Sequence, residues 1–298
     1  MIIMRRFDMY VPENQNDLLQ YLDKHHEGVY IIANGSDLIN RIQRNQVHPK
    51  ILVDLTGLHE LSYVKKENGV FRIGAMTTIS EIFTSPLLDS KYEGFRDVAR
   101  TFGGPSIVNV ATVGGNICSA SSSEDLLPLL LILDAELRLR SLKGDRVVRV
   151  EDFVKGKRTI DLAPNEIMME TVFHDIDEDS TCAFEKVGMR NSLITAFVNC
   201  AVYLKLSKRT MQVEDIRIAL NRVNGKIPAR ARGTEEKTRG QRLDQRCLNS
   251  AINTLRNELQ LSTDFRASQE YRMEVASNLL RKALTRCGEE LSGEKILV

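Results

Sequence analysis

The sequence predicts an α+β protein of two domains, and three patterns support this prediction. Alternating β-rich runs flank Asn68-Gly69 and Lys143-Gly144, as in β-hairpins. Residues 268–286 instead carry apolar side chains at helical spacing. The polar, acidic segment 175–180 divides a chain of 298 residues, which is long enough for two hydrophobic cores. We therefore predict one domain over residues 1–176 and another over residues 177–298.

The composition is that of an ordinary globular protein and argues against several functional classes. The chain has 41 Lys and Arg against 40 Asp and Glu, a formal net charge of +1. This balance gives no overall attraction to nucleic acid, so we expect no nucleic-acid partner. The longest apolar stretch, residues 126–135, is interrupted by Pro128 and Asp134 and is far shorter than the ~20 residues that span a bilayer. No apolar run follows Arg5 and Arg6, so we expect no signal peptide and a cytoplasmic location.

Cysteine and histidine spacing indicates neither a metal site nor a catalytic nucleophile. The five histidines lack the HxxxH and HExxH patterns. The five cysteines lie at least 18 residues apart, too far for a metal knuckle or a redox motif. We expect reduced, mostly buried thiols at Cys118, Cys182, Cys200, Cys247 and Cys287.

The first domain alternates short helices with strands. Leu18, Leu19 and Leu22 give the first helix an apolar stripe, and Gly28 ends it. Thr77-Thr78 can cap a short helix. The other predicted helices cover residues 38–44, 95–102 and 124–135, and the predicted strands cover 29–32, 51–55, 62–66, 70–73, 137–140, 146–150 and 166–173.

The second domain is predicted to contain a small antiparallel sheet covered by two helices. The three strands are expected over residues 182–187, 195–206 and 216–220. The helices are expected at about 244–259 and 268–286.

Two glycine-containing segments are candidates for ligand binding. They are Ala33-Asn34-Gly35-Ser36-Asp37, after a strand, and Thr112-Val113-Gly114-Gly115-Asn116, before a helix. Both offer backbone N–H groups where no Cβ obstructs a ligand, and neither contains Lys or Arg, which suits a dinucleotide pyrophosphate held by amides and hydroxyls. The alternative is that both are plain turns, since neither G-x-G-x-x-G nor a P-loop occurs.

These segments, with four others, resemble one known family over nearly the whole chain. The family is that of the FAD-binding, or medium, subunits of molybdenum hydroxylases such as xanthine dehydrogenase, carbon monoxide dehydrogenase and nicotinate dehydrogenase. The six matching segments are residues 33–37, 73–78, 104–117, 121–128, 184–190 and 271–275. The run Thr-Val-Gly-Gly-Asn-Ile at 112–117 is the most specific of them.

The resemblance implies a flavoprotein fold and a set of FAD-binding residues. The fold is the vanillyl-alcohol oxidase and p-cresol methylhydroxylase type, with two α+β subdomains, FAD between them, and a C-terminal α+β domain built on the three-stranded sheet. By position, the pyrophosphate and ribityl chain would contact Ile31, Ile32, Ala33, Asn34, Gly35, Ser36, Asp37 and Leu38, together with Thr112, Val113, Gly114, Gly115 and Asn116.

Four further residues are implied by the resemblance, and each has a structural alternative. Phe102 would lie near the isoalloxazine or the adenine-proximal wall, and Met168 would cover the adenine, but both side chains also suit a core. Asp125 would hold a ribose or pyrophosphate-side hydroxyl, or cap a helix. Lys186 would reach the flavin, or be an edge charge with a packed stem.

The implied function is electron transfer by a flavin-carrying subunit. FAD would take electrons from the [2Fe-2S] clusters of a small partner and pass them to a terminal acceptor. A large molybdopterin subunit would supply the electrons to the clusters, and the three subunits would form a heterotrimer. No residue of this chain would be catalytic. Asn34 stands where the family prefers Gly, and Val108 where Arg commonly precedes Asn109. A flavin-free scaffold of the same fold is therefore the alternative, and an independent flavin oxidase is a third possibility.

Overall fold

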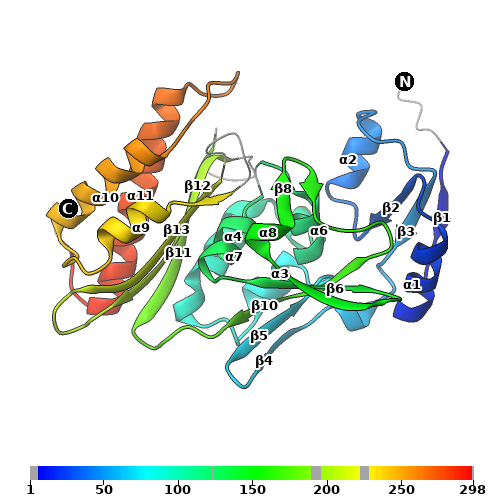
Figure 1. Ribbon diagram of the computed structural model, residues 1–298, viewed down its shortest axis with the longest axis horizontal. Helices are drawn as coiled ribbons and strands as arrows, with labels where there is room; N and C mark the ends of the chain where they lie inside the picture. The colour runs from blue at the N-terminus through cyan, green and yellow to red at the C-terminus, as the bar shows by residue number, and fades with distance from the viewer. Residues whose placement is uncertain (1–5, 123, 189–195, 222–227, 297–298) are drawn as a thin grey trace.

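The computed structural model describes residues 6–122, 124–188, 196–221 and 228–296. These residues form successive layers of sheets and helices, from the N-terminal strands at the right of Figure 1 to the C-terminal helices at its left. Met189, Arg190 and Thr195, which belong to segments discussed above, lie outside the described residues. Within the described ranges, no helix is both long enough and apolar enough to cross a membrane.

A small parallel sheet forms the N-terminal end of the molecule. Its strands are β1 (Asp8–Tyr10), β3 (Ile51–Asp54) and β2 (Val29–Ile32), in that spatial order. The predicted first helix is α1 (Gln15–Lys24), and it buries Leu18, Leu19 and Leu22 against this sheet. The second is α2 (Leu38–Gln43), which begins directly after the glycine segment that follows β2.

A five-stranded sheet forms the next layer. Its strands, in spatial order, are β4 (Val64–Glu67), β5 (Val70–Gly74), β10 (Ile167–His174), β6 (Glu136–Ser141) and β7 (Gly144–Arg149). The hairpin predicted at Asn68-Gly69 is confirmed, because both residues have the positive φ angles, 51° and 74°, that a type I′ turn requires. The hairpin predicted at Lys143-Gly144 joins β6 to β7.

Shorter elements connect these strands. The helix predicted after Thr77-Thr78 is α3 (Ile79–Thr84), and its first turn is a capping box in which Thr78 and Glu81 exchange backbone and side-chain hydrogen bonds. The other connecting elements are η1 (His59–Leu61), η2 (Ser90–Tyr92), α5 (Pro105–Val108), α6 (Val113–Ser119), α8 (Val150–Phe153), β8 (Val154–Gly156) and β9 (Thr159–Ile160).

Two helices lie between the five-stranded sheet and the C-terminal sheet. They are α4 (Glu93–Phe102) and α7 (Leu126–Ile132). All seven residues of α7 are buried, because one side packs in the first core and the other contacts strands of the C-terminal sheet. The continuous apolar run in the sequence is therefore a helix covered on all sides. It is shorter than the predicted 124–135.

The C-terminal sheet has four strands in the described residues, so the prediction of three is wrong. Its order is β11 (Ser180–Gly188), β12 (Ala196–Leu206), β13 (Val213–Asn221) and β14 (Ala229–Arg230). The strand that was missed, β14, has only two residues, too few to show an alternating pattern.

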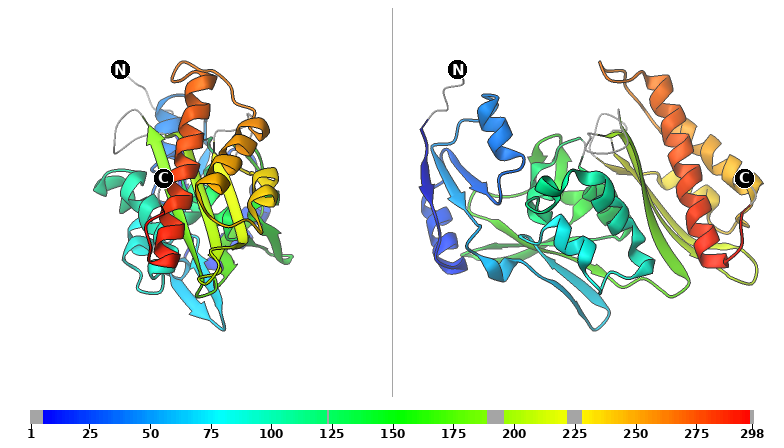
Figure 2. Two further views of the ribbon diagram at one scale, coloured as in Figure 1. Left: turned by 90° about the vertical axis from the view of Figure 1, so that its left-hand side faces the viewer. Right: turned by 180° about the vertical axis from the view of Figure 1, so that it is seen from behind.

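Three helices cover the outer face of this sheet, as Figure 2 shows from behind. They are α9 (Arg232–Thr238), which was not predicted, and the two predicted helices α10 (Gln245–Glu258) and α11 (Gln269–Ser292). The sheet is buried on both faces, since Ala201 and Tyr203 of β12 join the first core while Val202 and Leu204 join the second. The five cysteines all lie in described segments as free thiols, and every one except Cys118 is buried.

A buried ion pair joins the two halves of the molecule. Lys186 Nζ on β11 lies 2.5 Å from Asp125 Oδ2 at the start of α7, and the two side chains are 3% and 5% exposed. Asn199 Nδ2 on β12 donates to the other oxygen of Asp125 at 2.9 Å, and Lys186 also donates to the carbonyl of Thr101. Each charge is therefore partnered, which a buried ion pair needs to avoid a large desolvation cost.

We predict that Lys186→Met destabilises the cofactor-free protein by about 3–5 kcal/mol, because it leaves the Asp125 carboxylate buried without its cation. The free energy of unfolding in urea, measured by circular dichroism, checks this. The control is Lys50→Met, which removes an exposed partner of Glu27 and should leave the free energy of unfolding nearly unchanged. Equal, small losses in both variants would contradict the structural role given to Lys186.

Candidate functional site

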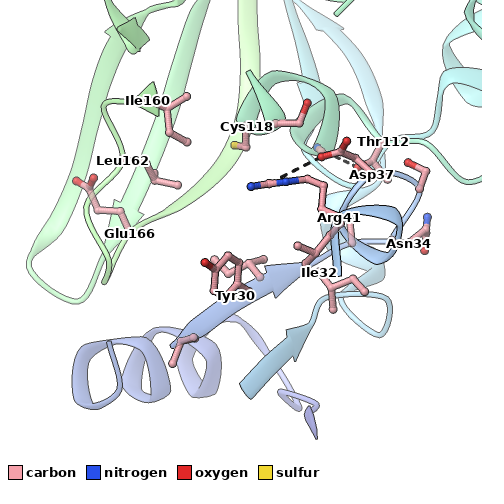
Figure 3. A pocket seen from close by; sticks show the side chains of 18 of the residues that line it. Tyr30, Ile32, Asn34, Asp37, Arg41, Thr112, Cys118, Ile160, Leu162 and Glu166 are labelled. Carbon is pink, nitrogen blue, oxygen red and sulfur yellow. Dashed lines mark hydrogen bonds and ion pairs between the residues drawn. The ribbon is translucent and has the colours of Figure 1, made fainter. Parts of the chain in front are cut away.

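Two adjoining clefts open between the N-terminal sheet and helix α6 (Val113–Ser119). The first cleft, drawn in Figure 3, encloses about 470 Å³. The second encloses about 660 Å³. Five residues line both clefts and mark the place where they meet: Ser36, Asp37, Arg41, Gly115 and Ser119.

The glycine segment after β2 forms one wall at this junction. Gly35 has a φ of +75°, and a Cβ added to it would lie 2.8 Å from Ile39 Cγ1, so glycine is needed on both grounds. Asn34 is not among the residues with left-handed backbone. Its Nδ2 donates to the carbonyl of Val110 at 2.8 Å, which ties the segment to the chain just before α6. Asn34 thus supplies a hydrogen bond that glycine in its place would lack.

The second glycine segment forms the opposite wall, but it is not the loop that the sequence predicted. Residues 113–119 are themselves helix α6, and Thr112 is its N-cap, with Oγ1 accepting from Gly115 N–H at 3.1 Å. The two glycines therefore lie in the first helical turn. Their Cβ positions explain the residue type: at Gly114 it would lie 2.9 Å from the Ala75 carbonyl oxygen, and at Gly115 it would lie 2.8 Å from Thr112 Oγ1.

An arginine connects the two walls. Arg158 binds both carboxylate oxygens of Asp37, at 2.7 and 2.9 Å, and also donates to the carbonyl of Ser119 at the end of α6. Arg158 lies between β8 and β9 in a left-handed conformation, φ 61°, and its N–H donates to the Ala120 carbonyl at 2.8 Å. Sequence reasoning missed this contact, because nothing in the sequence pairs two residues so far apart in the chain.

The first cleft is mainly apolar beyond the junction. Figure 3 shows Tyr30 and Ile32 on the N-terminal side and Ile160 and Leu162 on the opposite side. Cys118 lines the same cleft, and burial raises the pKa of its thiol to about 12, so it stays protonated at neutral pH. Such walls suit a flat, uncharged ring system.

The second cleft is mainly cationic. Its charged lining comprises two acidic residues, Asp37 and Glu124, and five basic ones, Arg41, Arg44, Lys157, Arg158 and Arg266. Phe102 and Ile107 add apolar surface. Two of its polar side chains have a buried atom with no hydrogen-bond partner among the described residues, Asn116 Oδ1 and Arg266 Nη1. Since buried polar atoms are normally paired, these atoms are available to a ligand.

Glu124 is a further site residue that sequence reasoning did not assign. Its carboxylate accepts hydrogen bonds from Asn116 Nδ2 and, at 2.5 Å, from Ser119 Oγ, both on α6. Its carbonyl accepts from Asn221 Nδ2 on β13 at 2.7 Å. Burial raises the pKa of this carboxyl to about 7, although the hydrogen bonds from serine oppose the shift. The Glu-Asp pair before α7 was visible in the sequence, but the burial of Asp125 and the hydrogen bonds of the half-buried Glu124 were not.

The structure distributes the predicted cofactor-binding residues between the cleft walls and the layer behind them. Ile31, Ile32, Ala33, Asn34, Gly35, Ser36, Asp37, Leu38, Thr112 and Gly115 line the first cleft, while Phe102 and Asn116 line the second. Val113, Gly114, Asp125, Met168 and Lys186 line neither.

Several of these buried residues support the walls from behind. The Sδ of Met168 lies 4.0 Å from the Sγ of Cys118 in the first cleft. Asp125 occupies the N-cap position of α7, but its side chain makes no capping bond, so the capping alternative is wrong. Lys186 is buried and ion-paired, so the edge-charge alternative is also wrong.

The residues present fit FAD, an elongated ligand with an anionic centre and two ring systems. Gly35 and Gly115 allow close backbone approach at the junction, where a pyrophosphate would lie. The unpartnered Asn116 Oδ1 can accept a hydroxyl hydrogen, and the unpartnered Arg266 Nη1 can donate to an anion or carbonyl. In the described residues no group of three or more His, Cys, Asp or Glu is arranged to hold a metal ion.

Solved structures share this fold. A chain of the carbon monoxide dehydrogenase from Hydrogenophaga pseudoflava is 24% identical, with a TM-score of 0.90, over 97% of this chain and 99% of that one. A chain of the reconstituted CO dehydrogenase from Oligotropha carboxidovorans is 26% identical, also with a TM-score of 0.90, over 96% and 99%. The predicted mixture of helices and strands in an FAD-binding and a C-terminal part is thereby confirmed.

Sequence comparison adds relatives from other dehydrogenases. The nicotinate dehydrogenase FAD-subunit of Eubacterium barkeri is 26% identical over 97% of this chain and 99% of its own length. The glyceraldehyde dehydrogenase medium chain of Sulfolobus acidocaldarius is 29% identical over 93% and 96%. A family model for the FAD binding domain in molybdopterin dehydrogenase matches residues 5–173, and one for the CO dehydrogenase flavoprotein C-terminal domain matches 183–287. Since the first model alone covers more than half of the sequence, the chain belongs to the family of FAD-binding medium subunits of molybdopterin dehydrogenases, which are oxidoreductases.

Proposed function

We propose that this chain transfers electrons within a molybdopterin dehydrogenase. Its FAD would receive electrons from the [2Fe-2S] clusters of a small subunit and pass them to a terminal acceptor. A large molybdopterin subunit would supply these electrons to the clusters. The observation that carries the proposal is the junction at Gly35 and Gly115, where an apolar and a cationic cleft meet at backbone open to a pyrophosphate. A cofactor laid across it would have one ring system in each cleft.

The two clefts differ in the ring that each suits. We assign the adenine to the apolar first cleft, where Met168 supports the wall through Cys118. We assign the isoalloxazine to the second cleft, because reduction adds negative charge that its excess of cationic side chains stabilises. In this assignment Lys186 and Asp125 do not contact the flavin directly. Lys186 holds the carbonyl of Thr101, which precedes the cleft residue Phe102, and Asp125 follows the cleft residue Glu124.

FAD supplies the redox chemistry, and the residues of this chain supply binding, orientation and charge. Thr112 fixes the first turn of α6, so that the helix N-terminus faces the junction. Asn34 and Arg158 hold the two walls together, and Arg266 reaches the second cleft from the C-terminal domain. In this assignment no side chain of the subunit forms or breaks a covalent bond to the substrate.

The partner subunits are inferred from the relatives. The names of those proteins, FAD-subunit and medium chain, describe parts of larger complexes. We propose a heterotrimer with the small and large subunits, a cytoplasmic location, and a first domain of the vanillyl-alcohol oxidase type. The proposed boundary at 176/177 falls between the ranges that the two family models match.

We predict that Gly115→Val weakens FAD binding at least tenfold, equivalent to about 1.4 kcal/mol, because the new Cβ meets Thr112 Oγ1 and the side chain occupies the junction. Fluorescence titration of cofactor-free protein with FAD measures this. The matched control is Gly57→Val, since a Cβ at Gly57 has nothing within 4 Å. If both variants bind FAD with parental affinity, the first turn of α6 is not part of the cofactor site.

Isolation of the complex with and without its iron-sulfur subunit tests the electron-transfer route. We expect the substrate of the large subunit to bleach the flavin absorbance only when the iron-sulfur subunit is present. If the isolated chain turned over a substrate by itself, the independent-oxidase alternative would replace this proposal. If the purified chain showed no flavin absorbance and bound none on reconstitution, the scaffold alternative would replace it.

A further inference from the structure

Glu124 is an acidic residue that lines the proposed flavin cleft and is hydrogen-bonded to the elements around it. Its side chain lines the second cleft and is bound by Asn116 and Ser119 of α6, the helix whose first turn carries Gly115. The Asn221 side chain fixes its backbone from the C-terminal sheet. The other acidic residue of this cleft, Asp37, is held by both nitrogens of Arg158. Among the residues that the structure describes, no cation forms a direct ion pair with Glu124 in the cleft.

We propose that Glu124 is a redox-linked proton site, which takes up a proton from solvent when the bound FAD is reduced. This inference rests on the proposed function, because it requires the isoalloxazine in the second cleft. Glu124 would be a positioning residue for charge, and the only bond formed on it would be the O–H of the added proton. Its role would be to remove one negative charge from the cleft as the cofactor gains one.

The charged groups around Glu124 make such proton uptake feasible. Burial is the largest influence and raises the pKa of Glu124 to about 7, and the neighbouring carboxylate of Asp125 on α7 raises it further. Hydrogen bonds from Ser119 and Ser121 lower it, as does the charge of Arg158 from the β8–β9 connection. Arg266 on the C-terminal side also lines the cleft. The carboxyl is thus poised near neutral pH, where one added negative charge protonates it.

The protons and electrons balance as follows. Bound FAD would take up two electrons from the partner's [2Fe-2S] clusters and one proton from solvent, so the second cleft would gain one negative charge. Glu124 accepts a second proton from solvent at a carboxylate oxygen, and no bond other than that O–H forms on the protein. The negative charge of reduced FAD would raise the pKa of Glu124. Glu124 would therefore take up the second proton only at pH values between its pKa beside oxidised FAD and its higher pKa beside reduced FAD.

The test is the pH dependence of the two-electron midpoint potential of the FAD-loaded chain. In the parent, we expect the potential to fall about twice as steeply per pH unit above pH 7 as in Glu124→Gln, because two protons rather than one accompany two electrons. Glutamine keeps the shape of the side chain, and its Oε1 can still accept a hydrogen bond from Asn116 Nδ2 or Ser119 Oγ. Glu136→Gln, which removes an exposed carboxylate from β6, should retain the steep slope.

A second variant separates this role from a structural one. Ser119→Ala removes a hydrogen bond that favours the charged carboxylate, so the steep region should begin at a higher pH than in the parent. Equal slopes in the parent and in Glu124→Gln, with FAD bound to both, would overturn this inference alone. Failure of the parent to bind FAD would overturn the proposed function, and this inference with it.

The cofactor-free protein gives an independent measurement. The pKa of Glu124 is raised by folding from an ordinary value of 4.5 to about 7, so the folded state binds more protons than the unfolded state between these values. This contribution to stability is full below about pH 4.5 and is lost as the pH rises through about 7. The urea midpoint of the parent should therefore fall relative to that of Glu124→Gln over this range, and a constant difference between them would show that Glu124 does not titrate there.

Discussion

The attachment of the glycine segment after β2 to both ends of α6 is the constraint on which the site depends. Asn34 donates to the Val110 carbonyl just before α6, and Asp37 is joined through Arg158 to the Ser119 carbonyl at the end of α6. Both walls need glycine where they meet, since a Cβ at Gly35 or Gly115 would contact a neighbour at 2.8 Å. This junction determines the shape of the clefts on either side. One cleft is mainly apolar and the other mainly cationic, and this combination suits a dinucleotide.

The C-terminal domain is tied to the site by buried polar contacts as well as by apolar packing. Asp125 connects α7 to Lys186 and Asn199, and Asn221 holds the backbone of Glu124. Because the sheet that carries these side chains is buried on both faces, it offers little freedom to move relative to α7. The charges around the second cleft are therefore positioned by both domains, although the C-terminal domain supplies few of the residues that line it.

Features that depend on neighbouring residues could be predicted from the sequence, whereas features that depend on residues far apart in the chain could not. The Asn68-Gly69 turn, the cap at Thr78 and the stripe of Leu18, Leu19 and Leu22 each depend on neighbours in the sequence, and each was predicted. The two-residue strand β14 depends on β13, and Gly114 in the first turn of α6 packs against Ala75, whose carbonyl accepts its N–H. In the site, the resemblance located both walls, whereas the Arg158 bridge and the hydrogen bonds of Glu124 to α6 became visible only in the tertiary structure.

The central claim is that one dinucleotide lies across both clefts, and identification of the flavin released from the purified chain tests it most directly. Heat denaturation followed by chromatography against FAD and FMN standards gives both identity and stoichiometry. The account predicts FAD at one molecule per chain, because only a pyrophosphate-containing flavin engages Gly35 and Gly115 while reaching both clefts. Release of FMN alone would contradict it, since a mononucleotide would leave one cleft without a ring.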